Sequence, residues 1–225
     1  MAGKGVIIEF DFAAMNGADL LYAVTKDFLA KLDGIALDER AEAKYLAGRS
    51  YLDGLGEYFA LVKTKKTAAK AARDLSDAVG AALTAVAPAA FTVAFKNFVR
   101  AIVDQGVKVV LSTRADVEAV KPAFDAAFAD LPEGRVVLYQ DTTDNYGSAT
   151  WLSWRRACAS AGIRNTSAVA VAGSGFGVRA ALVAGMGSMA VMCDHVAYQD
   201  FGGADAVVSE LSGKTAKKLI GVLRL

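Results

Sequence analysis

A glycine-rich turn, residues 173–177 (GSGFG), is the segment whose residue types most directly suggest chemistry. It lies between an apolar run and a helical pattern, so its backbone N–H groups should face outward at a helix N-terminus, where they can bind an anion. The spacing also resembles a dinucleotide-binding fingerprint, because Asp194 follows 21 residues after Gly173, near the position of a ribose-binding acid. Val178 stands where the third glycine is required, and only 31 residues follow Asp194. We therefore favour a phosphate or sulfate site over a dinucleotide site.

Other reactive side chains are few, with one histidine, His195, and two cysteines, Cys158 and Cys193. This count excludes a disulfide scaffold, a zinc finger and a multi-histidine metal site. No G-x-S-x-G elbow accompanies His195, so we interpret it as an ordinary loop histidine. Cys158 shares an apolar helix face with Trp151 and Trp154, which predicts a core thiol.

Charge and hydropathy narrow the possible partners. The 225 residues include 25 basic and 24 acidic side chains, for a net charge of +1, so no global field favours nucleic acid. No segment reaches the roughly 18–20 apolar residues of a membrane span, and residues 1–4 lack a signal-peptide layout. We expect a soluble intracellular protein, in the cytoplasm or, had a transit segment been removed, in an organelle lumen such as the plastid stroma.

Short β-branched runs alternate with alanine-rich helical stretches along the chain. Such continuous apolar strands separated by helices predict a parallel sheet buried on both faces. Helices are expected over residues 91–104 and from about residue 176. The predicted strands are 6–10, 107–111, 135–139, 168–171 and 189–192.

About 95 residues separate the first two predicted strands, far more than one crossover helix needs. Helical patterns fill this gap, so residues 17–86 are predicted to form a helical cap over the C-terminal edge of the sheet. Residues 1–16 and 87–225 would then form the core domain. A basic run on the cap is interpreted as a solvated helix face; it consists of Lys63, Lys65, Lys66 and Lys70.

This layout resembles the haloacid dehalogenase (HAD) superfamily, in the branch of β-phosphoglucomutases and xylulose bisphosphate phosphatases. The matching segments are residues 6–11 (VIIEFD) for the D-x-D strand, 18–22 (ADLLY) for the first cap helix, 48–50 (GRS) for the Gly-x-Ser cap loop, 106–113 (GVKVVLST) for the second motif, 172–186 for the fourth motif and its helix, and 199–208 for the tail. The resemblance implies an α/β fold, a Rossmann-like parallel sheet flanked by helices, with an inserted helical cap.

The resemblance also implies a first motif with two aspartates, one that attacks phosphorus and one that acts as general acid and base. The best register places Glu9 at the nucleophile position and Asp11 at the acid/base position. Glutamate reaches roughly 1.2–1.5 Å further, and a 1 Å misplacement can cost about 10²-fold in rate. In the other register Asp11 is the nucleophile, and Ala13 replaces the acid/base. Neither register completes the motif.

Two further groups in the family hold the transferring phosphoryl oxygens. Thr113 fills the hydroxyl position of the second motif, whereas the lysine of the third motif falls at or near Ser148. No lysine lies between residues 121 and 214, and Arg155 or Arg156 are the nearby candidates for a substitute.

The metal site of the family would need a carboxylate after the fourth strand, where this chain has Ala172 and Gly173. Hard cations bind through charged oxygen ligands, so this loss removes most of the expected affinity. We therefore expect no cofactor. Mg²⁺ is implied only for an active enzyme, with Asp11, Asp141 and Asp144 as its possible ligands.

The main hypothesis is a pseudoenzyme that has lost phosphoryl transfer and serves a binding, regulatory or structural role, with a protein partner or a second copy as its partner. One alternative is an active phosphatase on a small phosphosugar, using Asp11 or Glu9. A second is a non-catalytic sensor of a phosphate or phosphosugar ligand. The sensor would use Thr113, Ser148, Gly173, Ser174, Gly175 and, from the cap, Arg49.

Aromatic residues gather around the altered motifs. Core or cap packing is the expectation for them, with a partner surface as the alternative. They are Tyr146, Trp151, Trp154 and Phe176.

Overall fold

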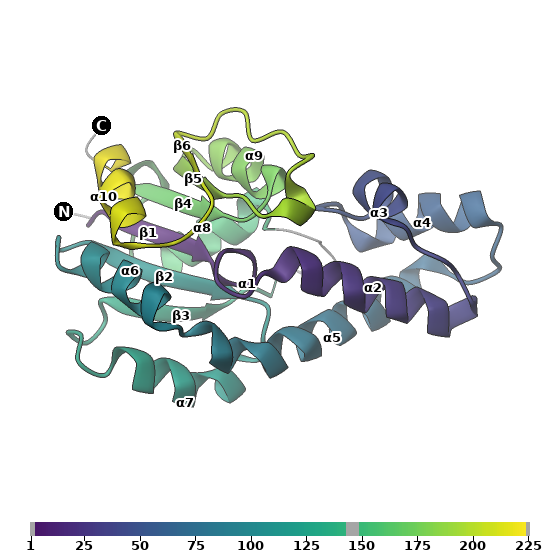
Figure 1. Cartoon of the computed structure of the whole chain (residues 1–225), viewed down its shortest axis with the longest axis horizontal. Coiled ribbons are helices and arrows are strands. Elements are labelled where there is room, and N and C mark those ends of the chain that lie inside the picture. The colour runs from purple at the N-terminus through teal and green to yellow at the C-terminus, as the bar shows by residue number, and fades with distance from the viewer. Residues whose placement is uncertain (1–2, 143–148, 224–225) are drawn as a thin grey trace.

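Six parallel strands form one sheet in the computed structural model, which describes residues 3–142 and 149–223 (Figure 1). The strand order is β3-β2-β1-β4-β5-β6, so β1 lies at the centre. The strands are β1 (Gly5–Glu9), β2 (Lys108–Thr113), β3 (Val136–Gln140), β4 (Ala168–Ala172), β5 (Gly187–Val191) and β6 (Ala206–Val208). Because all strands run in one direction, their carboxyl ends meet at one edge of the sheet.

Helices cover both faces of this sheet. Alternate residues of β1 point to opposite faces: Val6 and Ile8 belong to one buried cluster and Ile7 to the other. The first cluster contains residues of α6 (Val93–Val103), α7 (Val117–Phe128) and α10 (Gly213–Val222). The second contains residues of α8 (Trp151–Ser160) and α9 (Gly175–Val183).

Four helices extend beyond the carboxyl ends of the strands and form the helical cap (Figure 1). A one-turn helix, α1 (Phe10–Ala13), leads from β1 toward them, and the short helix η1 (Ala87–Ala90) leads back. The cap helices are α2 (Gly17–Asp33), α3 (Glu39–Tyr45), α4 (Tyr51–Val62) and α5 (Ala68–Val86).

The cap and the sheet share one continuous apolar core. Leu21, Leu55 and Leu75 from the cap helices lie in the same buried cluster as Val6 and Ile8 of β1. The helices fall within the predicted range 17–86, while the division into two separate domains stays a prediction. A shared core implies that moving the cap would expose apolar surface.

The α/β fold predicted from the sequence is confirmed, and the five predicted strands lie within two residues of their observed bounds. Phe10 is a correction, because it begins α1 instead of ending β1. The sixth strand, β6, was not predicted; it is three residues long and Val207 in it is exposed, so it carries little apolar signal. Two short helices, η2 (Asn165–Ser167) and η3 (Asp194–Val196), complete the described elements.

Two predictions about the surface can be checked directly. The lysines of the basic run are all exposed, as expected for a solvated face. Within residues 3–142 and 149–223, no single helix is long and apolar enough to cross a membrane; residues 68–90 and 93–103 meet that test only together, as a pair bent by 79°.

Candidate functional site

The carboxyl edge of the sheet brings the altered motifs together. Glu9 ends β1, beside Ser112 near the end of β2, and β4 ends nearby at Ala172. Asp11 follows Glu9 within α1, and Thr113 is the last residue of β2. The sequence-predicted pair and the predicted hydroxyl therefore lie in one place.

Asp11 is buried and binds other residues of the chain through both of its carboxylate oxygens. The hydroxyl of Thr113 donates to Asp11 Oδ1. Arg114 donates to Asp11 Oδ2 twice, from its backbone N–H at 3.0 Å and from Nε at 3.1 Å. The side chain expected to serve as acid/base, or as nucleophile in the other register, is thus held by a hydroxyl and a guanidinium.

Arg114 is a buried cation of this site that the sequence interpretation missed. Its side chain is only 17% exposed, and burial alone would lower its pKa, but its interactions with Asp11, followed by Tyr51 and Glu9, outweigh burial and raise that pKa. It therefore stays protonated at neutral pH. The available signal was its place directly after Thr113, at the end of a central strand.

A cap residue reaches this ion pair. Tyr51, the first residue of α4, is 2% exposed; burial raises the pKa of its hydroxyl, and the nearby Arg114 partly offsets that rise. The buried cation of the core is therefore also in electrostatic contact with the cap.

Both carboxylate oxygens of Glu9 accept hydrogen bonds from backbone amides. Its Oε1 accepts a hydrogen bond from the N–H of Ala149 at 2.8 Å, and its Oε2 accepts one from the N–H of Gly173 at 3.1 Å. Burial raises the pKa of this carboxyl above its ordinary value of 4.5, and the two amides, followed by Arg114, partly oppose that rise. Glu9 thus joins β1 to the segments that follow β3 and β4.

The glycine-rich turn has three of its N–H groups engaged within the chain. Gly173 donates to Glu9, Gly175 donates to the side chain of Gln199 at 2.7 Å, and Gly177 donates to the hydroxyl of Ser174 at 2.9 Å. Ser174 thereby caps the N-terminus of α9. These amides would have to give up their partners to bind an external anion.

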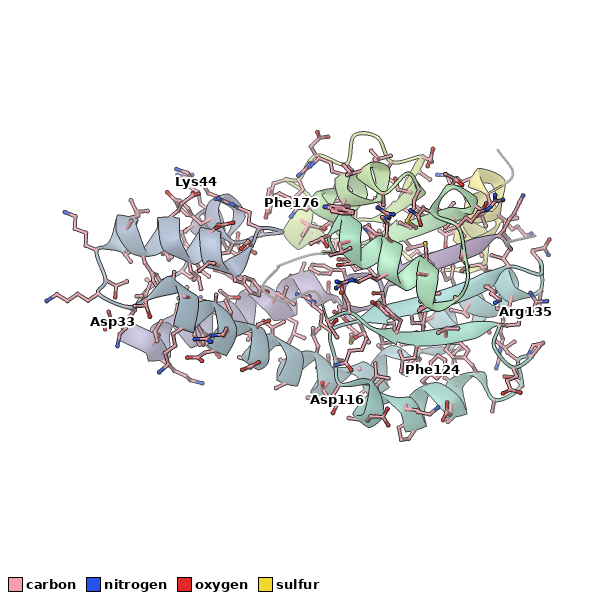
Figure 2. The ribbon with its side chains drawn as sticks, turned by 180° about the vertical axis from the view of Figure 1, so that it is seen from behind. Asp33, Lys44, Asp116, Phe124, Arg135 and Phe176 are labelled. Atoms are coloured by element: carbon pink, nitrogen blue, oxygen red, sulfur yellow. The ribbon has the colours of Figure 1, made fainter. Side chains whose placement is uncertain are left out.

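Two phenylalanines lie close to glycines of the altered motifs. A Cβ on Gly173 would lie 2.2 Å from Cβ of Phe12, and a Cβ on Gly48 of the cap would lie 2.2 Å from the ring of Phe176. Figure 2 shows Phe176 at the junction between the sheet and the cap helices. Only glycine fits at either position without a shift of its neighbours.

One cavity at the junction of cap and core is very small. The cavity bordered by Phe12, Gly48, Tyr51 and Ser174 has a volume of about 20 Å³. That is room for about one water molecule, whereas ligand pockets have volumes of roughly 300–1,000 Å³.

A larger open cleft lies to one side, between α5 and the carboxyl ends of β2 and β3. Its volume is about 560 Å³, and Arg114 forms part of its wall. Three acidic residues, Asp77, Asp116 and Asp141, line the same cleft. Asp116 is the N-cap residue that directly precedes α7 at this edge, as Figure 2 shows, and its carboxylate accepts a hydrogen bond from the N–H of Glu118.

The predicted cations lie elsewhere. Arg49 pairs with Glu57, with N–O distances of 2.6 and 3.0 Å, and that hydrogen bond raises the pKa of Arg49. Arg155 and Arg156 are exposed, and Arg155 lies 5.7 Å from the ring centre of Trp151. Ser148, Asp144 and Tyr146 lie outside the described residues.

The oxygen atoms available at this site do not fit Mg²⁺ as ligands. Both oxygens of Glu9 accept amide hydrogens, both oxygens of Asp11 accept from Thr113 or Arg114, and the third carboxylate position is Ala172 or Gly173. Within residues 3–142 and 149–223, no three His, Cys, Asp or Glu side chains form a group able to hold a metal ion. A hard cation would meet an arginine and amide hydrogens here instead of free oxygens.

The remaining candidates are two buried side chains, one half-exposed side chain and the first residue of a short helix. Cys158 is fully buried, and burial raises the pKa of its thiol to about 11, which confirms the predicted core thiol. Trp154 is also fully buried and donates from its indole N–H to the carbonyl of Gly177. Trp151 is half exposed, and Asp194 begins the short helix η3.

Comparisons with known proteins support the fold assignment. The sequence matches no family profile and no curated protein. A phosphonoacetaldehyde hydrolase-like protein from Oleispira antarctica aligns with 100% of this chain and 94% of its own, at a TM-score of 0.71 and 13% identity. A putative β-phosphoglucomutase from Bacteroides vulgatus aligns with 100% of this chain and 91% of its own, at a TM-score of 0.69 and 14% identity. CbbY from Rhodobacter sphaeroides, in complex with xylulose 1,5-bisphosphate, aligns with 93% of this chain and 95% of its own, at a TM-score of 0.64 and 14% identity.

This chain therefore has the HAD fold with a helical cap, as its sequence motifs predict. At these identities the likeness establishes the fold, and the similar structures with that fold include a phosphonoacetaldehyde hydrolase-like protein, β-phosphoglucomutases and HAD-family hydrolases. What this chain does depends on its own site residues.

Proposed function

We propose that this chain is a non-catalytic protein with a HAD fold, in which the former phosphoryl-transfer site has become part of the structural core. Its role would then be binding, regulatory or structural. The observation that carries the proposal is the pairing of Asp11 with Thr113 and Arg114, which uses both carboxylate oxygens of the aspartate that the family resemblance assigns to the first motif.

The state of Glu9 supports the same conclusion. A nucleophilic carboxylate must present a free, ionised oxygen to phosphorus. Both Glu9 oxygens accept backbone N–H groups, and burial raises the pKa of this carboxyl, which disfavours the ionised form. Attack would require breaking at least one of these hydrogen bonds in a buried position.

The small size of the cavity between Phe12 and the cap is a further argument. A phosphosugar cannot enter a cavity of about 20 Å³, and opening the cap would separate residues of one apolar core. The ring of Phe176 against Gly48 adds a contact that opening would break.

An active phosphatase with Asp11 as nucleophile is the second candidate. The similar solved structures favour it, since they include β-phosphoglucomutases and HAD-family hydrolases. The open cleft of about 560 Å³ beside Arg114 is also large enough for a small phosphosugar. This candidate requires Arg114 to release Asp11 before any reaction.

A phospholigand sensor receives less support. Arg49, its predicted cap contact, is paired with Glu57, and three amides of the glycine-rich turn have internal partners.

Turnover decides between the first two candidates. Purified protein would be incubated with Mg²⁺ and p-nitrophenyl phosphate, β-glucose 1-phosphate or xylulose 1,5-bisphosphate, with Asp11→Asn purified in parallel as the control. The proposal expects the two proteins to release phosphate at the same background rate. Wild-type turnover that Asp11→Asn abolishes would establish the phosphatase and overturn the proposal. Turnover common to both proteins would exclude Asp11 as its source and come from contamination or another site; Glu9→Gln distinguishes them, because loss of turnover in that variant would overturn the proposal and unchanged turnover would leave it standing.

A further inference from the structure

We propose that Thr113 and Arg114 form a small oxyanion site and that the carboxylate of Asp11 is its built-in ligand. Three donors converge on this carboxylate: the Thr113 hydroxyl, the Arg114 backbone N–H and Arg114 Nε. A hydroxyl, an amide and a guanidinium together form a set of donors suited to any small carboxylate. Asp11 would keep free anions out of this site.

The donors are fixed before any ligand binds. Thr113 is 1% exposed, and its hydroxyl oxygen accepts the N–H of Ala115 at 3.0 Å, which leaves its own hydrogen for Asp11. The carbonyl of Thr113 accepts the N–H of Asp141 at 2.7 Å, which holds the end of β2 against the segment after β3. Rigid donors of this kind bind an anion with little reorganisation.

Access and charge indicate which anion would fit. Arg114 forms part of the wall of the 560 Å³ cleft, and its side chain is 17% exposed, so the site lies directly behind this wall. Asp77, Asp116 and Asp141 line that cleft and would repel a multiply charged anion. The site should therefore prefer a compact monoanion such as formate.

The intact protein should not bind such an anion at this site. Asp11 is attached two residues from the end of β1, so its carboxylate acts at a high effective concentration that a free ligand cannot match at millimolar levels. Removing the side chain leaves an opening the size of a carboxylate beside a buried arginine.

Chemical rescue of Asp11→Ala tests the inference. The variant should melt roughly 6–20 °C below wild type, because Arg114 loses its buried partner. Sodium formate should then raise the melting temperature in a saturable way, by about 3–6 °C at tenfold excess over its Kd. Sodium chloride at equal ionic strength should give no saturable rise, and wild type should not respond to formate. The double variant Asp11→Ala/Arg114→Met is the matched control and should not respond either.

An equal response to formate and chloride, or a response that persists without Arg114, would overturn the inference. Should Asp11→Ala aggregate, refolding from urea replaces melting: a higher native yield in formate than in chloride supports the site, and equal yields contradict it.

The inference rests on the proposed function in one respect, that Asp11 stays in place in the intact protein. The two can fail separately, because wild-type turnover abolished by Asp11→Asn would refute the proposed function, whereas absent formate rescue would refute only the oxyanion site.

Discussion

Two carboxylates at the end of β1 are buried in different ways. Asp11 faces the β2 side of the sheet, where a cation, Arg114, balances its charge. Glu9 is hydrogen bonded to segments that follow β3 and β4, where the N–H groups of Ala149 and Gly173 hold its oxygens. A buried charge needs either an opposite charge or several directed donors. The chain uses the first solution at one corner of the site and the second at the other.

The difference shows how each corner depends on its neighbours. At the Asp11 corner, stability should depend on keeping both charges, because either one alone would be buried without compensation. At the Glu9 corner, it should depend on close backbone approach, which glycine at position 173 allows. The first corner should be sensitive to charge removal and the second to added side-chain volume and to pH.

The largest expected effect is at the Asp11 corner. Arg114→Met keeps much of the side-chain volume but leaves Asp11 without its cation, so the free energy of unfolding should fall by about 3–5 kcal/mol. Urea denaturation monitored by circular dichroism measures this change in the free energy of unfolding. Arg155→Met, at an exposed position, is the matched control and should change stability little.

A loss under about 1 kcal/mol for Arg114→Met would mean that the ion pair is not a structural element of this corner. The double variant Asp11→Leu/Arg114→Met sharpens the comparison, because replacing both partners by apolar groups should recover most of the stability lost in the single variant.

Added volume should disturb the Glu9 corner by a smaller amount. In Gly173→Ala the new Cβ would lie 2.2 Å from Cβ of Phe12 and 3.1 Å from backbone atoms of the same residue, so the neighbouring backbone must move. We expect a loss of about 1–3 kcal/mol in the same denaturation experiment. Gly221→Ala, where nothing lies within 4 Å in helix α10, should instead be stabilising by about 0.5–1 kcal/mol. Equal effects at the two glycines would contradict the close approach.

The pH dependence should be the smallest and most selective difference. Burial raises the folded-state pKa of Glu9 above 4.5, so its favourable contribution is present below that pH and is lost as pH rises through the folded pKa. Wild type should therefore lose stability relative to Glu9→Gln above pH 4.5, by at most about 1.4 kcal/mol per pH unit.

Urea denaturation at pH 3, 4, 5, 6 and 7 measures this stability gap. Glu57→Gln is an opposite-sign control, because the hydrogen bond with Arg49 lowers the pKa of Glu57; its contribution is present above pH 4.5 and is lost as pH falls through the lower folded value. A gap between Glu9→Gln and wild type that does not move with pH would contradict the buried state of Glu9.

The sequence predicted the sheet well because its strands are short apolar runs separated by helical patterns. The HAD resemblance predicted that Glu9, Asp11 and Thr113 share one site, and the structure brings them together where parallel strands end at one edge. The sequence interpretation missed β6, whose three residues carry almost no pattern.

The partners within the site were harder to predict. Arg114 adjoins Thr113 in sequence, yet whether it faces solvent or turns onto Asp11 depends on the space beside α1. Arg49 was expected to face a ligand, but it pairs with the carboxylate of Glu57, which lies eight residues later in α4. The contacts of Phe12 with Gly173 and of Phe176 with Gly48 depend on three-dimensional packing that a residue list does not encode.

A crystal structure grown in phosphate and Mg²⁺ tests the central claim most directly, because it shows where the Asp11 carboxylate lies when a competing anion is abundant. The account predicts that Asp11 still accepts from Thr113 and Arg114 and that the cavity between Phe12 and Gly48 stays closed. Phosphate bound to Thr113, with Asp11 turned away and Mg²⁺ beside Glu9, would contradict it.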